Sequence, residues 1–264
     1  MTTLEGKVAL ITGGNSGIGR ATARAFASAG AKVVIAARGV ERGEEAAHEI
    51  EVAGGQVIFI RADVSQPVEV EQLLARTIDA YGRLDCAFNN AATEGAMKLL
   101  ADFTEHDFDT TISINLKSVW LCMRQQIRHM LQQLPAGGVL VNTSSVNGLG
   151  GVAQGALYAA TKAGVLALTK SAAQEYAPQG IRVNALVAGG FHTPMLERVF
   201  ERAGGGDPET AAAVEGQLAQ MIPLRRIGRP EEAAEAVVWL CSDAASYVTG
   251  HSMIVDGGLT AWAR

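Results

Sequence analysis

The sequence predicts an α/β fold in which a doubly wound parallel sheet of seven strands carries helices on both faces. Short unbroken apolar runs, rich in Val and Ile, alternate along the chain with longer helical stretches. Runs of this kind are typical of parallel strands that are buried on both faces. Neither an internal repeat nor a low-complexity linker interrupts the alternation, so residues 1–264 are expected to form a single domain.

Each predicted strand and helix has its own local signal. The strands are expected at residues 8–11, 32–37, 56–60, 84–88, 137–142, 181–187 and 252–255. The helices are expected at residues 20–29, 40–53, 67–81, 104–134, 155–176 and 229–241. Gly30 ends the first helix and Pro67 begins the third, as the positional preferences of these residues suggest. Thr104 and Asp107 are spaced as in a capping box and predict the start of the long fourth helix.

Residues 190–223 break the regular alternation of strands and helices. Three consecutive glycines from Gly204, followed by Asp207 and Pro208, interrupt any long helix, so short helices are expected on either side. An irregular excursion of this length after a strand end is usually a binding loop or a lid. We therefore predict that residues 190–223 form a substrate-binding loop.

Composition narrows the classes of function and location. The net charge is −5 and no Lys/Arg cluster is present, so no nucleic-acid partner is expected. Cys86, Cys122 and Cys241 are odd in number and widely spaced, which predicts buried thiols rather than disulfides or a metal site. Strand-like sequence begins at residue 8, and no apolar run reaches transmembrane length. A cytoplasmic protein without a membrane partner or a metal is expected.

The first predicted strand is followed by a glycine-rich turn, residues 12–19, that leads into a helix. Glycines in this position let the chain turn tightly and bring bare amides close to a diphosphate. They also let the helix pack closely on the sheet. A purely structural turn is the alternative, but the position between a buried strand and a helix favours dinucleotide binding.

The end of the second predicted strand bears on which dinucleotide would bind. An acidic side chain at this point accepts hydrogen bonds from the adenosine ribose, whereas an Arg favours a 2′-phosphate. Here Ala36 and Ala37 are followed directly by Arg38, and the acid is absent. The sequence favours NADP(H), with NAD(H) as the alternative. The other interpretation of Arg38 is a solvated loop residue close to Arg42.

Tyr158 and Lys162 lie four residues apart in the predicted helix 155–176, which places both on one helix face. A nearby cation favours the phenolate and would lower the phenol pKa from its ordinary value of about 10. Such a pair suits proton transfer, although an exposed Tyr beside a solvated Lys is the alternative. Asn115 interrupts an apolar stretch of the predicted helix 104–134, where a solvent-facing side chain is the simplest interpretation.

Together these residues resemble the short-chain dehydrogenase/reductase family, and the resemblance covers essentially the whole chain. Its motifs are matched by residues 12–19, Asp63-Val64, Asn89-Asn90-Ala91, residues 184–193, Arg229-Pro230-Glu231-Glu232 and Val255-Asp256-Gly257-Gly258. The family's catalytic tetrad is matched by Asn115, Ser145, Tyr158 and Lys162. The resemblance implies a Rossmann-type fold and an oxidoreductase that transfers a hydride between NAD(P)(H) and a ketone or secondary alcohol.

The resemblance also implies roles for single residues. Tyr158 would be the general acid or base, with Lys162 lowering its pKa and holding the nicotinamide ribose. Ser145 would bind the carbonyl oxygen, and Asn115 would hold a water that connects Lys162 to solvent. The cofactor contacts implied are Gly13, Asn15, Ser16, Gly17, Ile18, Gly19, Arg38, Asp63, Val64, Asn89, Ala91, Tyr158, Lys162, Gly189, Phe191 and Thr193. The substrate-pocket residues expected are Ser145, Val152, Gln154, Tyr158, Phe191, His192, Met195 and Leu196.

Three positions depart from the family pattern. Ala92 stands where Gly is usual, which would be strained if that position needed a positive φ. Ala188 stands where Pro is common, and Phe191 takes a place usually held by Ile or Val. These departures bear on loop geometry and pocket shape and leave the chemistry untouched.

Other functions remain open at this point. A dinucleotide-binding sensor or scaffold on the same fold would tolerate loss of Tyr158 or Lys162, and both are present. Two related enzyme classes are disfavoured. By family resemblance, sugar-nucleotide epimerases have a different glycine spacing from this chain, and enoyl reductases space their Tyr and Lys more widely. The partner expected is a small carbonyl or alcohol substrate. A homotetramer or homodimer is also expected, paired through helices 104–134 and 155–176, because these carry more apolar residues than one core-facing stripe needs.

Overall fold

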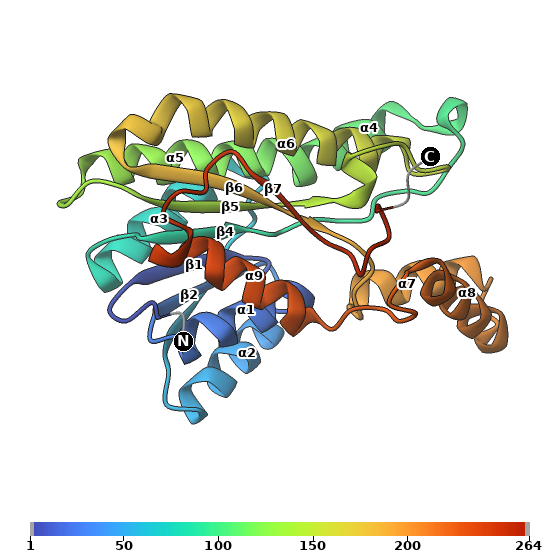
Figure 1. The fold of residues 1–264 in the computed structure, drawn as a ribbon, viewed down its shortest axis with the longest axis horizontal. Helices are drawn as coiled ribbons and strands as arrows, with labels where there is room; N and C mark the ends of the chain where they lie inside the picture. The colour runs from blue at the N-terminus through green and yellow to red at the C-terminus, as the bar shows by residue number, and fades with distance from the viewer. Residues whose placement is uncertain (1–2, 262–264) are drawn as a thin grey trace.

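The computed structural model describes residues 3–261 and contains a seven-stranded parallel sheet in the order β3-β2-β1-β4-β5-β6-β7 (Figure 1). The strands are β1 Val8–Thr12, β2 Lys32–Ala37, β3 Gln56–Arg61, β4 Cys86–Asn89, β5 Gly138–Ser145, β6 Ile181–Ala188 and β7 Ser252–Val255. Strand order reverses between β1 and β4, because the chain crosses back from β3 to the other side of β1. The predicted doubly wound fold is confirmed.

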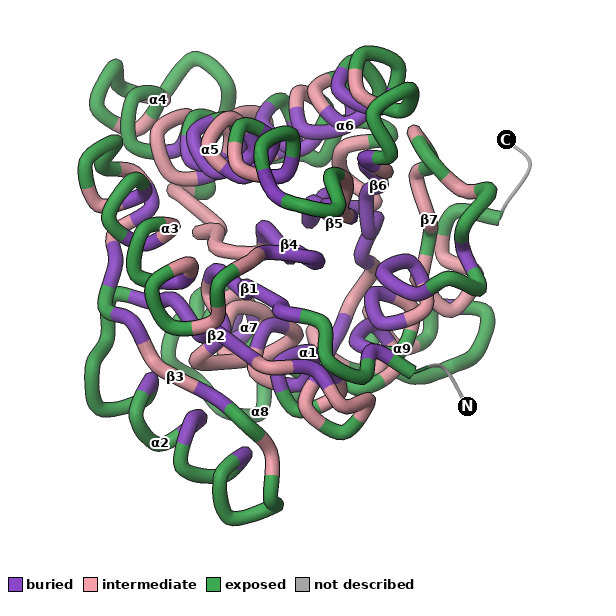
Figure 2. The backbone as a smooth tube through the Cα atoms, turned by 90° about the vertical axis from the view of Figure 1, so that its left-hand side faces the viewer, coloured by how far each residue is buried: buried purple, intermediate pink, exposed green. Residues whose placement is uncertain are grey.

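Helices cover both faces of the sheet (Figure 1). On one face lie α1 Gly17–Ser28, α2 Val40–Val52 and α9 Pro230–Cys241, and on the other lie α3 Pro67–Tyr81, α5 Ser118–Gln132 and α6 Ala156–Tyr176. Neighbouring side chains of β1 pack into the hydrophobic cores on opposite faces of the sheet. Ile11 packs towards α1, and Leu10 packs towards α3 and α5. Figure 2 shows the resulting buried strands between more exposed helices. None of the helices described between residues 3 and 261 has the length and apolar character needed to cross a membrane.

The predicted long helix 104–134 is present as one continuous helical stretch, but it is not α-helical throughout. The structure has α4 Glu105–Ile112, a π-helical turn Ser113–Lys117, and then α5. Thr104 and Asp107 form the predicted capping box at the start of α4. The π turn coincides with Asn115, whose side chain is wholly buried and bonds both the N–H and the C=O of Thr93 at 2.8 Å. Insertions of this kind in a helix are frequent at functional sites.

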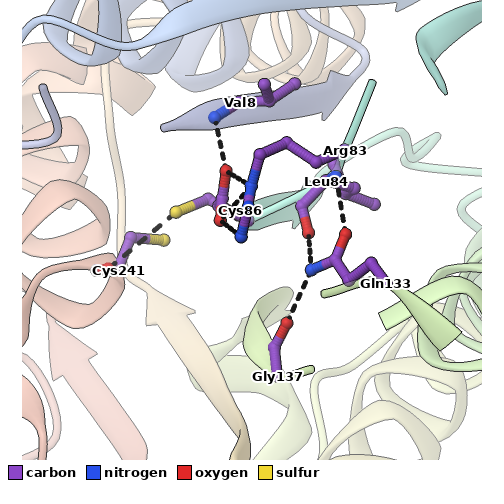
Figure 3. Close-up of polar contacts among 8 residues, drawn as sticks. Val8, Arg83, Leu84, Cys86, Gln133, Gly137 and Cys241 are labelled. Atoms are coloured by element: carbon purple, nitrogen blue, oxygen red, sulfur yellow. Dashed lines mark hydrogen bonds and ion pairs between the residues drawn. The ribbon is translucent and has the colours of Figure 1, made fainter. Parts of the chain in front are cut away.

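The amino-terminal end of β4 is held by side chains (Figure 3) in addition to backbone bonds from Asp85 to the neighbouring strands. Gln133 accepts from the Leu84 N–H at 3.0 Å and donates to the Leu84 carbonyl at 2.9 Å. Asp85 accepts from the Val8 N–H at 2.9 Å and pairs with Arg83 at 2.8 Å. Because Gln133 satisfies the Leu84 backbone, β4 begins at Cys86, two residues later than expected.

Residues 190–223 contain the short helices expected of them, α7 Pro194–Ala203 and α8 Pro208–Met221. They project beyond the sheet at the right of Figure 1. Their apolar side chains form a small separate cluster around Phe200, Ile222 and Ile227. This α7–α8 segment is therefore attached to the body of the molecule by few buried contacts.

Candidate active site

A cleft of about 650 Å³ runs along the carboxyl edge of the sheet, from the ends of β2 and β3 to β6 and α7. Its volume lies within the range usual for small-molecule sites. Most of the expected site residues line this cleft. They are Gly13, Asn15, Ser16, Gly17, Ile18, Arg38, Asp63, Val64, Ala91, Ser145, Val152, Tyr158, Lys162, Gly189, Phe191, Thr193, Met195 and Leu196.

The glycine turn after β1 has a geometry that side chains would prevent. Gly13 and Gly17 have φ values of +66° and +50°. A Cβ on Gly19 would lie 2.1 Å from the Gly13 carbonyl oxygen, and one on Gly13 would lie 2.9 Å from the Ala91 Cα. The first turn of α1 lines the cleft here, and amides at a helix start lack partners within the helix. The turn therefore fits a diphosphate group.

A chain of polar contacts joins this turn to the interior of the site. The Asn90 amide donates to the Gly13 carbonyl at 3.4 Å and accepts from the Thr143 hydroxyl at 3.2 Å. The Thr143 carbonyl in turn accepts from the Lys162 ammonium at 2.9 Å. These hydrogen bonds thus connect the ends of three neighbouring strands, β1, β4 and β5, to α6.

The far end of the cleft, beyond β2, is positively charged. Arg38 follows β2 directly and is exposed, and Arg42 on α2 also lines the cleft. The Asn15 amide nitrogen lies close to Gly39, 3.5 Å from where a Cβ would stand. On the β3 side, Asp63 accepts from the Ser65 hydroxyl at 2.7 Å and lines the same region. Two guanidinium groups and an amide at this end suit a phosphate group.

Lys162 is buried near the opposite end of the cleft. Its side chain is 2% exposed, and its ammonium lies 5.6 Å from the centre of the Tyr158 ring. Burial lowers the pKa of Lys162 to about 8, because removal from water disfavours the charged form. The backbone carbonyl of Lys162 is held by the Ser144 hydroxyl at 2.8 Å, which fixes α6 against β5.

The Tyr158 phenol has a pKa above its ordinary value, chiefly because it is buried. The Ser145 hydroxyl, as a hydrogen-bond partner, lowers that pKa, and the negative charge of Glu94 raises it. The expectation that Lys162 pulls the net pKa down is not met in this structure. Burial outweighs the other influences, and the ammonium donates to the Thr143 carbonyl and lies over the ring.

Five expected residues do not line the cleft. Asn115 and Gly19 are buried behind it, and Asn89 bonds Gln126 and Asn142 within the core. The solvent-facing interpretation of Asn115 is therefore wrong. Gln154 is exposed, and its carbonyl accepts from the Lys98 N–H at 3.0 Å. His192 is also exposed, and its Nδ1 lies 3.7 Å from Glu215.

The three departures from the family pattern have simple local consequences. Between residues 3 and 261, positive φ values outside glycine occur at Gln154 and Arg225, so Ala92 carries no such strain. Ala188 ends β6 and is buried. Phe191 is 5% exposed and packs on Gly228, where a Cβ would lie 2.7 Å from the ring. Phe191 therefore closes one wall of the cleft by packing into the core.

Sequence reasoning missed Glu94 and Arg198, which also line the cleft. The Glu94 carboxylate accepts from Arg198 Nε at 3.0 Å and from Arg198 Nη2 at 3.2 Å. The two residues are 104 positions apart, and no local spacing signals their contact. The available hint was an acidic residue two positions after Ala92, at the end of a predicted strand where ligands of such sheets bind.

Comparisons with known proteins agree with this geometry. A family model described as enoyl-(acyl carrier protein) reductase matches residues 13–260. The chain is 41% identical to 2,5-dichloro-2,5-cyclohexadiene-1,4-diol dehydrogenase of Sphingobium indicum, over 99% of this chain and 100% of the relative. It is 39% identical to levodione reductase of Leifsonia aquatica, over 98% and 96% of the two chains. It is also 40% identical to 3-oxoacyl-(acyl-carrier-protein) reductase of Thermotoga maritima, over 97% and 98%.

A solved structure shares the whole architecture. The crystal structure of levodione reductase superposes with a TM-score of 0.93 at 38% identity, covering 98% of this chain and 99% of that one. Full-length similarity of this degree, to relatives named as dehydrogenases and reductases, establishes both the family and the type of reaction. The chain belongs to the short-chain dehydrogenase/reductase family and is an oxidoreductase that acts on alcohol and ketone groups.

Proposed function

We propose that this protein is an NADP(H)-dependent enzyme that interconverts a small cyclic ketone and its secondary alcohol, with Tyr158 as the general acid and base. The observation that carries the proposal is the grouping of buried Ser145 and Lys162 with half-buried Tyr158 along a cleft that begins at the glycine turn. The expected contacts of Asn89, Gln154 and His192 are left out of this assignment, because their side chains lie away from the cleft.

The residues present fit a nicotinamide dinucleotide. Gly13, Gly17 and the first amides of α1 would hold the diphosphate, Asp63 and Val64 the adenine, and Gly189 and Thr193 the nicotinamide end. The bound nicotinamide supplies or accepts the hydride in the reaction. Arg38, supported by Arg42, would bind a 2′-phosphate, which supports NADP(H) over NAD(H) as the cofactor.

Tyr158 donates a proton to the carbonyl oxygen during reduction and removes it from the alcohol during oxidation. Ser145 donates a hydrogen bond to the same oxygen, where negative charge develops. Lys162 lends positive charge from beneath the phenol ring and holds the nicotinamide ribose. The Asn115 side chain is committed to Thr93, so its backbone carbonyl is the group left to hold a water that relays protons to Lys162.

The substrate pocket has largely apolar walls. Val152, Phe191, Met195 and Leu196 line it, and α7 covers it as a lid. These walls suit a compact hydrocarbon ring better than an extended polar chain. The names of the Sphingobium diol dehydrogenase and of a 3beta-hydroxysteroid dehydrogenase of Eggerthella lenta, 40% identical, support a ring alcohol as substrate.

A 340 nm assay with NADPH and NADH, over a panel of cyclic ketones, acyclic ketones and 3-oxoacyl thioesters, tests this proposal. We expect the highest kcat/KM with NADPH and a cyclic ketone. Turnover of no ketone in the panel, with tight NADPH binding, would favour the sensor or scaffold alternative.

Enoyl reduction is the second candidate, because the matching family model carries that description. An enoyl thioester belongs in the same panel for this reason. Tyr158 and Lys162 are spaced for carbonyl chemistry, so we expect turnover of the enoyl thioester below that of the cyclic ketone.

The assembly expected is a homotetramer, or a homodimer, in a reducing cytoplasm. Phe108 on α4 and Trp120 and Leu131 on α5 are exposed large apolar side chains, which a partner copy packed along these helices would cover. The three cysteines are buried and unpaired, which suits a reducing compartment. Light scattering at micromolar concentration tests the assembly, and a monomer would refute it.

A further inference from the structure

A partly buried carboxylate joins the two walls of the substrate end of the cleft. Glu94 lies in the loop after β4, and its side chain is only 14% exposed. Both of its oxygens accept from Arg198 on α7, at 3.0 and 3.2 Å, and Arg202 approaches to 3.5 Å. The contact with Arg198 is bidentate, the geometry in which an Arg–carboxylate pair is most specific.

The loop that carries Glu94 is held firmly from below. Thr93 is bonded through both backbone groups to Asn115, and the Lys98 N–H donates to the Gln154 carbonyl at 3.0 Å. The Lys98 ammonium also pairs with Asp107 at 2.7 Å. The α7–α8 segment, in contrast, has its own small core. Glu94 is therefore a fixed anchor to which Arg198 ties the more loosely attached α7.

The charges that line the cleft are unevenly distributed. Among the described lining residues, Arg38, Arg42 and Asp63 lie at the β2–β3 end, and Lys162 is buried under Tyr158. Glu94 and Arg198 are the charged lining residues at the α7 end, and they neutralise each other. Around them the wall is apolar, with Met97, Val152, Met195, Leu196, Val199 and Leu218.

We propose that Glu94 is a specificity-determining residue that makes this pocket select uncharged substrates and reject carboxylates. The proposal deepens the proposed function and rests on it. By accepting from Nε and Nη2 of Arg198, Glu94 occupies the face of the guanidinium that could bind a substrate carboxylate in a bidentate way, and it offsets the charge of that cation. A substrate carboxylate that bound Arg198 in this way would have to displace Glu94 and leave that partly buried carboxylate with only its longer contact to Arg202, at 3.5 Å. An uncharged ring substrate neither displaces Glu94 nor leaves a carboxylate poorly paired. The pocket therefore discriminates against carboxylate substrates by repulsion as well as by the fit of its apolar walls.

The test uses two ring ketones that differ in charge, 4-oxocyclohexane-1-carboxylate and its methyl ester. For the wild-type enzyme with NADPH, we expect kcat/KM for the ester to exceed that for the carboxylate by at least about tenfold. In Glu94→Gln, which keeps the shape and removes the charge, this ratio should fall at least about tenfold, mainly through a lower KM for the carboxylate.

Arg198→Met is expected to move the ratio in the opposite direction, because it leaves the Glu94 charge unpaired in the pocket. Glu209→Gln is the matched control, since it removes the same charge from an exposed position on α8, outside the lining. It should leave the ratio unchanged. Thermal melting of each variant checks that it is folded.

An unchanged ratio in Glu94→Gln, or the same change in Glu209→Gln, overturns the inference. Failure of the wild-type enzyme to reduce either ketone, or any ketone of the broader panel, overturns the proposed function and the inference with it. Turnover of the ester with no discrimination against the carboxylate overturns the inference alone.

Discussion

The Lys162 ammonium lies 2.9 Å from the carbonyl oxygen of Thr143, in the interior of the protein and beneath the ring of Tyr158. A single hydrogen bond to a neutral carbonyl compensates only part of the loss of water around an ammonium. The position therefore destabilises the fold, which is the cost expected of a residue placed for the proposed chemistry.

Replacement of this ammonium should stabilise the protein. Lys162→Met fills a similar volume without charge, and we expect the free energy of unfolding at pH 7 to rise by about 1–2 kcal/mol. In the wild type, the folded state loses the proton near pH 8, whereas the unfolded state keeps it to about pH 10.4. The unfolded state binds more protons in this interval, so wild-type stability rises with pH there. Urea titrations at several pH values should show the advantage of Lys162→Met shrinking between pH 8 and 10.

Loss of the Tyr158 hydroxyl should abolish turnover and leave the cofactor in place. Tyr158→Phe removes only the exchangeable proton, so we expect kcat to fall by about 10²- to 10⁴-fold. NADPH affinity, measured by fluorescence titration, should stay near the wild-type value. Tyr176→Phe, at the far end of α6, is the control and should retain full activity. A Tyr158→Phe enzyme with near-normal kcat would contradict the assigned role.

Arg38 should set the preference for NADPH. Arg38→Ala removes charge-assisted hydrogen bonds to a 2′-phosphate, so the ratio of kcat/KM for NADPH to that for NADH should fall by about ten- to a hundredfold. Arg24→Ala, an exposed change on α1 away from the cleft, should leave the ratio as it is. Equal use of both cofactors by the wild type, unaltered in Arg38→Ala, would contradict NADP(H) selection.

The glycine turn should tolerate no side chain at its closest point. Gly19→Ala places a Cβ 2.1 Å from the Gly13 carbonyl oxygen, so the turn must open and NADPH binding should be lost. Gly216→Ala in α8 meets nothing within 4 Å and serves as the contrast. It should bind NADPH normally and gain up to about 1 kcal/mol of stability, since Ala favours a helix over Gly. Calorimetric titration with NADPH distinguishes the two variants. Normal NADPH affinity in Gly19→Ala would contradict the proposal that the glycine turn binds the diphosphate.

The charge of Glu94 should appear in the pH dependence of alcohol oxidation. The groups acting on Tyr158 are Ser145 on β5, Lys162 on α6 and Glu94 beyond β4, with Glu94 itself paired to Arg198. Glu94 disfavours the phenolate and raises the Tyr158 pKa, so Glu94→Gln should lower it. The rise of kcat/KM for oxidation should then occur at lower pH than in the wild type. A profile that stays in place, or moves to higher pH, would contradict this interaction.

Local patterns predicted the parts of the site that depend on local geometry. The glycine turn needs a strand, glycines and a helix in succession, and the pairing of Tyr158 with Lys162 needs only a spacing of four in a helix. Both are visible in sequence. The buried character of strands in a parallel sheet likewise made their positions readable to within two or three residues.

Contacts between distant segments set the features that the sequence did not predict. The π turn between α4 and α5 accompanies the bonding of Asn115 to the Thr93 backbone; the polar Asn115 stands out in its apolar stretch, but its partner lies 22 residues away. The start of β4 depends on Gln133, which is 49 residues away. The pairing of Glu94 with Arg198 depends on how α7 folds back over the cleft.

Asn90 has a consequence for the transfer of cofactor preference between enzymes of this kind. Its side-chain amide donates to the Gly13 carbonyl in the glycine turn and accepts from the Thr143 hydroxyl. The carbonyl of Thr143 in turn binds the Lys162 ammonium. A glycine turn transplanted from a relative would therefore meet this amide and shift it if the turn differs in shape. Because the shift would reach the proton-transfer ammonium, a graft designed to alter cofactor choice would also alter turnover. Such grafts should exchange residues 12–19 and position 90 as one unit.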